Sequence, residues 1–196
     1  ADVSYTFSGA GKITGPTGLV KTNAGTLTIN TANDYTGPTI IGGGTISVGQ
    51  LANGGAASRL GAASSDPANL QFFNSALQYT GGNVTVDRGA TLAGGGGTFN
   101  VTSGGTTLTW SGTNIGSGTL IKSGAGTLTL SAANSFTGGT IINEGTLALD
   151  GPAGGGTTTA NNYSLSSGSV TFQGGTLRLF GYAGSTSPEY GTFNRP

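Results

Sequence analysis

The sequence predicts an all-β fold in which short strands coil into a solenoid, and three observations support this prediction. Residues 19–48 return as residues 120–149 at a constant offset of 101, as Leu19 and Leu120 show. Inside this repeat, similar Thr-Leu strands follow one another at intervals of about 20 residues, the pattern of stacked coils that bury one shared core. Forty of the 196 residues are glycine, which turns a tight corner at no steric cost. A β-sandwich also has short strands but gives no reason for their near-constant spacing.

Composition excludes several classes of protein. Only 7% of the residues are charged, and seven basic residues balance seven acidic ones, so no positive field exists for nucleic acid or anionic lipid. Cys and His are absent, which removes disulfides, thiol nucleophiles, the usual zinc ligands and histidine acid–base chemistry. The sequence holds no run of 18 apolar residues, so we expect no transmembrane helix and, with no ligand set in view, no cofactor.

The first part of the chain reads as a series of strands. Val3–Phe7 alternates apolar and hydroxyl side chains, the period of a half-buried strand, and a glycine-rich loop follows at Gly9–Gly18. In Thr26–Ile29 we expect the apolar pair to face inward and the threonines outward. Thr39–Ile41 and Thr45–Val48 supply two further strands, because turn dipeptides and a glycine run separate them.

The stretch Gly49–Asn69 interrupts this pattern with Ala, Gly, Ser and Asn, and we expect a protruding loop or a short helix there. Strands then resume at short intervals: Leu70–Phe72, Ala76–Tyr79, Val84–Val86, Thr91–Leu92 and Phe99–Val101. The strand Thr107–Trp110 matches the first strand of the chain and leads into the second copy of the repeat.

The match between the two halves continues beyond the second copy. Val170–Phe172 and Thr176–Leu179 correspond, at an offset of 100, to the first strands after the interrupting stretch. We therefore expect one continuous solenoid over residues 1–196, built from unit 1 (about residues 1–95) and unit 2 (about residues 96–196). Neighbouring coils should stack about 4.8 Å apart, with equivalent leucines in an inner ladder. These leucines are Leu108, Leu128 and Leu147.

The repeat resembles a known family. Its second copy opens with Lys122-Ser123-Gly124-Ala125-Gly126 and continues as Thr-Leu-Thr-Leu, Ala-Asn-Ser-Phe-Thr-Gly, Thr-Ile-Ile and Gly-Thr-Leu. This string is similar to the autotransporter-associated β-strand repeat of passenger regions in large surface proteins of Gram-negative bacteria. The first copy departs from it at Asn23-Ala24. The resemblance implies a right-handed parallel β-helix and an extracellular or cell-surface location, but no single activity, because such repeats serve as stalks under many.

An enzyme on this fold needs a pair of carboxylates, as glycoside hydrolysis does. The nearest two in sequence are Glu144 and Asp150, which lie on opposite sides of one strand, and no carboxylate recurs between the units. The glycine runs lack the Asp of calcium-binding solenoids, so we expect no metal. Asp87 and Arg88 read as a solvated pair in a turn. We therefore predict no enzymatic activity and assign no catalytic residue.

Two further groups of residues are candidates for binding. Lys21 and Lys122 are the charges that recur between the units, and we expect them to point outward from a short edge. Five aromatic residues could stack on sugars: Tyr35, Trp110, Phe136, Tyr163 and Tyr182. The first three occupy repeated aromatic positions, so we expect them to pack inside.

These observations predict a non-enzymatic structural protein of the bacterial surface, a stalk or fibre subunit with adhesion as a further role. The alternative is a carbohydrate-binding or polysaccharide-degrading module whose site lies in Gly49–Asn69 and Asp150–Asn162. The chain enters the repeat near the phase of residue 104 and leaves it near that of residue 96, so we expect copies to stack head to tail. Expected partners are thus the chain itself and a host surface, an abiotic surface or glycans.

Overall fold

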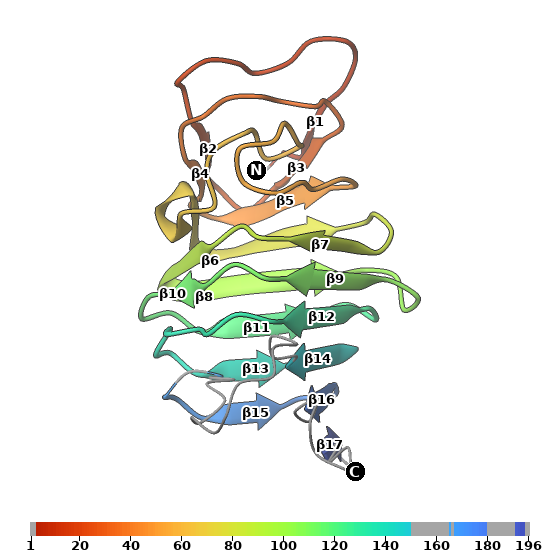
Figure 1. The fold of residues 1–196 in the computed structure, drawn as a ribbon. Helices are drawn as coiled ribbons and strands as arrows, with labels where there is room; N and C mark the ends of the chain where they lie inside the picture. The colour runs from red at the N-terminus through yellow and green to blue at the C-terminus, as the bar shows by residue number, and fades with distance from the viewer. Residues whose placement is uncertain (1–2, 150–164, 166, 180–190, 195–196) are drawn as a thin grey trace, which may run out of the picture.

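A computed structural model describes residues 3–149, 165, 167–179 and 191–194 of the chain. Short, mostly parallel strands stack into a solenoid of about seven turns, as Figure 1 shows. The predicted fold class, an all-β parallel solenoid, is therefore confirmed. Helix is confined, in the described residues, to one 3-10 turn, η1 (Pro67–Asn69).

Two neighbouring faces of the solenoid belong to one sheet. The first face contains β2 (Leu19–Lys21), β4 (Thr39–Ile41), the opening residues of β6 (Leu70–Tyr79) and β8 (Ala90–Val101), and β10 (Asn114–Ile115). The second face contains β1 (Tyr5–Phe7), β3 (Thr26–Ile29), β5 (Gly44–Val48), the closing residues of β6 and β8, β11 (Leu120–Ser123), β13 (Thr140–Ile142) and β15 (Val170–Phe172). Because β6 and β8 run through the corner between these faces, they join them into one sheet.

The third face forms the second sheet. Its strands are β7 (Val84–Val86), β9 (Thr107–Trp110), β12 (Thr127–Leu130), β14 (Thr146–Leu149), β16 (Thr176–Leu179) and β17 (Gly191–Asn194). All of these pair in parallel except β17, which lies antiparallel to β16 on the edge that β14 does not occupy.

Inward ladders of side chains form the core, because every second residue of a strand faces the inside. On the third face Leu108, Leu128 and Leu147 pair in register and are buried, which confirms the predicted ladder. Leu177 extends it by one coil. In the same core the ring of Phe99 contacts two other aromatic rings, that of Phe72 at a centroid separation of 5.3 Å and that of Trp110 at 5.0 Å.

Equivalent strands of the two units lie on different faces. On the second face, the inward position passes from coil to coil through residues paired in register: Leu27, Ile46, Leu77, Phe99 and Lys122. Lys122 thus lies four coil steps along the stack from Leu27. The counterpart of Leu27 at the offset of 101 is Leu128, which follows Lys122 on the third face. One unit therefore holds four coils and one further face, and unit 2 is turned by one face relative to unit 1.

The stretch Gly49–Asn69 follows the solenoid, so the prediction that it protrudes is wrong. Asn33 of the neighbouring coil and Ser58 form an antiparallel bridge, with two backbone hydrogen bonds of 2.8 and 3.1 Å. The prediction of a short helix is confirmed for η1. The stretch supplies the third side of its own coil, and two of its apolar side chains are buried there: Leu51 and Leu60.

Candidate functional site

The two recurring lysines lie at the inside of the solenoid corners. Lys122 is 0% exposed, and its Nζ donates to three backbone carbonyl oxygens at 2.7, 2.7 and 3.1 Å: those of Ser123, Gly124 and Glu144. Lys21 repeats the arrangement at 2.8, 2.6 and 3.1 Å with three other carbonyls: those of Thr22, Asn23 and Gly43. The prediction that these lysines point outward is therefore wrong.

The backbone of the corner explains why the lysines turn inward. Each corner passes through a left-handed residue, Gly124 with a φ of 76° in unit 2 and Asn23 with a φ of 65° in unit 1. Asn tolerates this conformation better than most residues, so the departure of the first copy at Asn23 keeps the same corner. Carbonyls that leave the strand there need donors from elsewhere, and a lysine ammonium supplies three.

The surroundings of Lys122 also decide whether its amine can react. Burial lowers the pKa of its ammonium to about 8, and the carboxylate of Glu144 opposes this shift. A lysine with a lowered pKa can serve as a general base or nucleophile. Here the Nζ faces three carbonyl oxygens inside the coil and is closed to solvent, so the geometry assigns it to the framework.

The asparagine of the Ala-Asn motif links one coil to the coil before it. The Oδ1 of Asn33 accepts from the backbone N–H of Ile13 at 2.9 Å, and the Oδ1 of Asn134 accepts from that of Asn114 at 2.9 Å. In both copies the side-chain amide donates to the carbonyl two residues earlier at 3.0 Å. Both asparagines are buried, so this recurring residue satisfies backbone groups rather than facing a ligand.

The repeated aromatic residues pack inside, as predicted. Tyr35, Trp110 and Phe136 are each fully buried. The hydroxyl groups of Tyr35 and Thr39 hydrogen-bond each other at 2.7 Å. Thr140 is the counterpart of Thr39, but Phe136 lacks a hydroxyl, and the buried Thr140 Oγ1 has no partner among the described residues. The other two aromatic candidates, Tyr163 and Tyr182, lie outside the described residues.

Asp87 and Arg88 hold the stretch Gly49–Asn69 against the solenoid, so the prediction of a solvated pair is wrong. The guanidinium of Arg88 is buried and donates to the carbonyl oxygens of Ala52 and Gly61, both at 2.8 Å. The Oδ1 of Asp87 accepts from the Gly54 N–H at 2.7 Å. Burial lowers the pKa of Arg88. Gly49–Asn69 is thus partly held against the solenoid. It is the first of the two stretches expected to hold a carbohydrate site.

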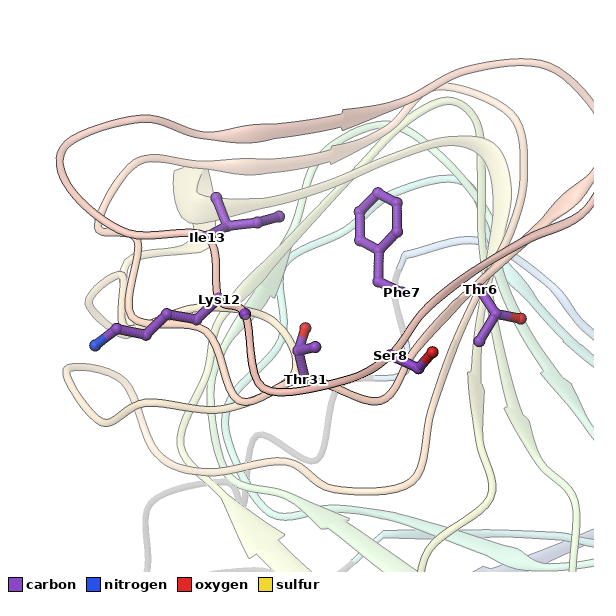
Figure 2. A pocket seen from close by; sticks show the side chains of 7 residues that line it. Thr6, Phe7, Ser8, Lys12, Ile13 and Thr31 are labelled. Carbon is purple, nitrogen blue, oxygen red and sulfur yellow. The ribbon is translucent and has the colours of Figure 1, made fainter.

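A pocket of about 300 Å³ opens at the N-terminal end of the solenoid, as Figure 2 shows. Phe7 and Ile13 form its apolar lining, and the side chain of Lys12 extends away from Phe7. One unit later, Val86 of β7 lies in register beside Trp110, the counterpart of Phe7. The pocket is therefore the uncovered interior of the first coil, in a position that another coil fills in unit 2.

Among the described residues, no three Asp or Glu side chains are grouped so that they could hold a metal ion. In the same part of the chain, no helix has the length and apolar character needed to cross a membrane. Asp150–Asn162, the second stretch expected to carry a carbohydrate site, falls outside the described residues.

Comparison with known proteins identifies the repeat. The family model of the passenger-associated-transport-repeat matches residues 19–48 and 120–149. Over 137 residues, or 68% of this chain, the sequence is 48% identical to the adhesin BmaC autotransporter of Brucella suis biovar 1 (strain 1330), and the chain spans 4% of that protein's length. No solved structure matches the chain. The resemblance to autotransporter-associated repeats is thus confirmed: the chain carries two passenger-associated-transport repeats.

Proposed function

We propose that this chain is a structural segment of a surface-exposed bacterial adhesin, a non-enzymatic stalk that holds an adhesive surface outside a Gram-negative-type cell. The main support for this proposal is that the polar side chains that recur between the two copies bind the backbone of the solenoid. Lys21, Lys122, Asn33 and Asn134 all bind backbone groups of the coils. The polar residues shared by the two copies of the repeat therefore serve the framework of the solenoid. The adhesive part of the proposal is supported by the relative, which is named an adhesin.

Adhesion is tested with latex beads coated with the folded chain. The beads are passed over mammalian cell layers, extracellular matrix, polysaccharide gels and bare polystyrene, and the fraction retained under flow is counted. We expect retention on at least one surface, and less after the chain on the beads is heat-denatured. Retention equal to that of albumin-coated beads on every surface would contradict an adhesive role.

We also propose that copies of the chain stack end to end through the larger sheet. Its terminal strands are β1 and β15, each paired on one side in the described part of the chain. The inward residues of β1 are open to solvent, with Tyr5 63% and Phe7 39% exposed. A parallel strand from another copy would cover them as Val86 covers Trp110. The smaller sheet cannot continue in the same way, because β17 occupies the outer edge of β16.

Sedimentation velocity and electron microscopy test this stacking. The chain should form linear oligomers as its concentration rises. Tyr5→Lys places a charge in the covered position and should abolish the oligomers, whereas Thr6→Lys, on the outward side of the same strand, should leave them. A chain that stays monomeric at high concentration would rule out the stacking without affecting the adhesive proposal.

A further inference from the structure

We propose that a groove on the outside of the solenoid, where β6 passes from the first face to the second, binds one ring of a neutral saccharide. The inference rests on the proposed adhesive function and names the chemistry of its ligand. In this assignment Phe73 supplies a flat apolar surface at the edge of the groove: it is not itself a lining residue but directly precedes Asn74, which is one. Asn74, Thr45 and Thr98 supply uncharged hydrogen-bonding groups.

Short side chains and bare backbone create the groove, which has a volume of about 180 Å³. Ala76 lies between Thr45 and Thr98, with which it pairs in register on the neighbouring strands. Because Ala76 is the shortest of the three side chains, a hollow remains between the two threonines. Gly95 and Gly96 also line it, with φ angles of 96° and 92° that favour glycine. The volume suits a single sugar ring rather than a larger ligand.

A β-bulge places Asn74 in the groove. The pairing of β6 with β8 shifts its register between Phe73 and Ser75, and Asn74 has a left-handed φ of 48°. Ser75 turns inward, where its hydroxyl donates to the Ile41 carbonyl at 2.6 Å. The bulge therefore closes the core with Ser75 and leaves Asn74 exposed outside. Bulges commonly redirect side chains next to binding sites.

The chemistry of the groove is neutral and only partly apolar. Phe73 is 38% exposed, and its ring lies against Gly94, where an added Cβ would be 3.1 Å from a ring carbon. The side chains of Asn74, Thr45 and Thr98 make no hydrogen bond to the described part of the chain, so their polar groups are available to a ligand. No charged side chain is among the described residues that line the groove.

A neutral sugar matches this combination better than an ion or an apolar peptide. The C–H face of a pyranose ring is apolar and can lie on an aromatic ring. Its hydroxyl groups both donate and accept hydrogen bonds, as do an amide and a threonine hydroxyl. An anionic ligand would lack a positive partner in the groove, and an apolar segment would leave the polar side chains without partners.

The framework itself does not require the aromatic residue. Ala76 pairs with Thr45 in unit 1 as Thr176 pairs with Thr146 in unit 2, so the corners before them correspond. Unit 2 has Gln173, Gly174 and Gly175 at the positions of Phe73, Asn74 and Ser75. The preceding coil of unit 1 turns its corner with three glycines, Gly42 to Gly44. Packing of the coil thus does not account for Phe73 and Asn74.

The test is a saccharide array followed by NMR titration. The folded chain is labelled and applied to neutral oligosaccharides of glucose, galactose, mannose and N-acetylglucosamine, with sialylated and sulfated oligosaccharides for comparison. The strongest neutral ligand is then titrated. We expect binding to a neutral saccharide, and an increase in Kd of about tenfold for Phe73→Ala, the scale of a lost aromatic contact.

Two more variants and one parallel measurement sharpen the result. Asn74→Gly keeps the left-handed backbone but removes the amide, and should also weaken binding, whereas Val20→Ala removes an exposed side chain from β2 and should not. No binding to any neutral saccharide, or binding unchanged in both groove variants, overturns the proposal. If either of these results is obtained and the coated beads still adhere to a surface, the groove proposal fails and the adhesive function stands. If the saccharide binds but no beads adhere, the adhesive function fails instead.

Discussion

The buried lysines show how single residues stabilise the corners of this solenoid. A lysine at an outward position would interact mainly with water, whereas Lys122 donates to carbonyls of two successive coils, those of Gly124 and Glu144. Burying an ammonium group is unfavourable unless its donors are satisfied, and here all three are. Lys21 makes the same contacts in a more exposed corner, which offers a built-in comparison within one chain.

Lys122→Met should therefore destabilise the chain. The apolar side chain leaves three carbonyl oxygens without a buried donor, and we expect a loss of about 2–4 kcal/mol in the free energy of unfolding. Lys21→Met should lose less, because water reaches the more exposed corner. Urea unfolding of both variants measures this. No loss for Lys122→Met would mean that the internal contacts add no stability. Equal losses in the two variants would mean that the exposure of the corner does not matter.

Lys122 should also make stability depend on pH. Its pKa of about 8 in the folded chain lies below the ordinary value of 10.5, so the folded state releases its proton first as the pH rises. Between these values the unfolded chain binds more protons, and the free energy of unfolding should increase with pH, by at most about 3 kcal/mol. Below about pH 8 both states hold the proton, and this contribution is constant.

The measurement is urea unfolding at about pH 7, 9 and 10.5, with Lys122→Met as the control for all other titrating groups. Wild type should gain stability relative to the variant across this window. A relative loss would show the opposite, that the three carbonyls hold the pKa of Lys122 above the ordinary value.

The Tyr35 and Phe136 pair offers a test in both directions. Tyr35→Phe removes the hydrogen bond to Thr39 and should destabilise the chain by about 1 kcal/mol. Phe136→Tyr gives the unpartnered Thr140 hydroxyl a partner and should stabilise it by a similar amount. Thermal unfolding midpoints of the two variants check the signs. If Phe136→Tyr lowers the midpoint, the space around Phe136 is too small for a hydroxyl.

At the scale of elements, the stretch Gly49–Asn69 shows that irregular sequence can still complete a coil. Its backbone carbonyls accept from the Arg88 guanidinium, as those of Ala52 and Gly61 show. The five donors of the guanidinium reach several carbonyls of a wide turn, which the compact ammonium of a lysine cannot do. Arg88 thus fixes the longest coil, as the lysines fix the tight corners.

Arg88→Met should release this stretch. We expect a loss of about 3 kcal/mol in stability, because several carbonyls lose a buried charged donor. Limited proteolysis followed by mass spectrometry should find faster cleavage within residues 52–65. Arg88→Lys keeps the charge but not the planar fork, and should fall between wild type and Arg88→Met. Unchanged cleavage in both variants would mean that other contacts hold the stretch.

How much the sequence predicted also differs from element to element. The strands and the ladder at Leu128 followed from periodicity, because apolar spacing reports directly on burial. The inward side of Lys122 did not, since charge normally favours the surface, although its recurrence before a glycine corner was a usable signal. Arg88 has no counterpart in the other unit, so its inward position could not be predicted from recurrence. The exposure of Phe73 could be predicted only weakly: it follows Phe72, and adjacent strand residues cannot both face inward.

The whole molecule combines these parts into a stack in which successive units turn by one face. Leu27 and Leu128 are equivalent in sequence but lie on the second and third faces. A surface feature repeated in each unit therefore points in a new direction from unit to unit. A feature confined to one unit, such as the groove at Phe73, points in one direction only.

The larger sheet should make the described units unfold together. β8 pairs with β6 of unit 1 and with β11 of unit 2, so it joins the two units directly. We expect one transition in urea, with the same midpoint by far-UV circular dichroism and by fluorescence of Trp110, the one tryptophan of the sequence. Two separate midpoints would mean that the units are independent domains.

Our central proposal is that this solenoid is a framework for adhesion and not for catalysis. The most direct test is to incubate the folded chain with a panel of plant, bacterial and animal polysaccharides, and to measure new reducing ends together with the size of each polymer. Our account predicts polymers of unchanged length, including any polymer that the chain binds. Cleavage of any polysaccharide that increases with the concentration of the folded protein and disappears on unfolding would contradict it.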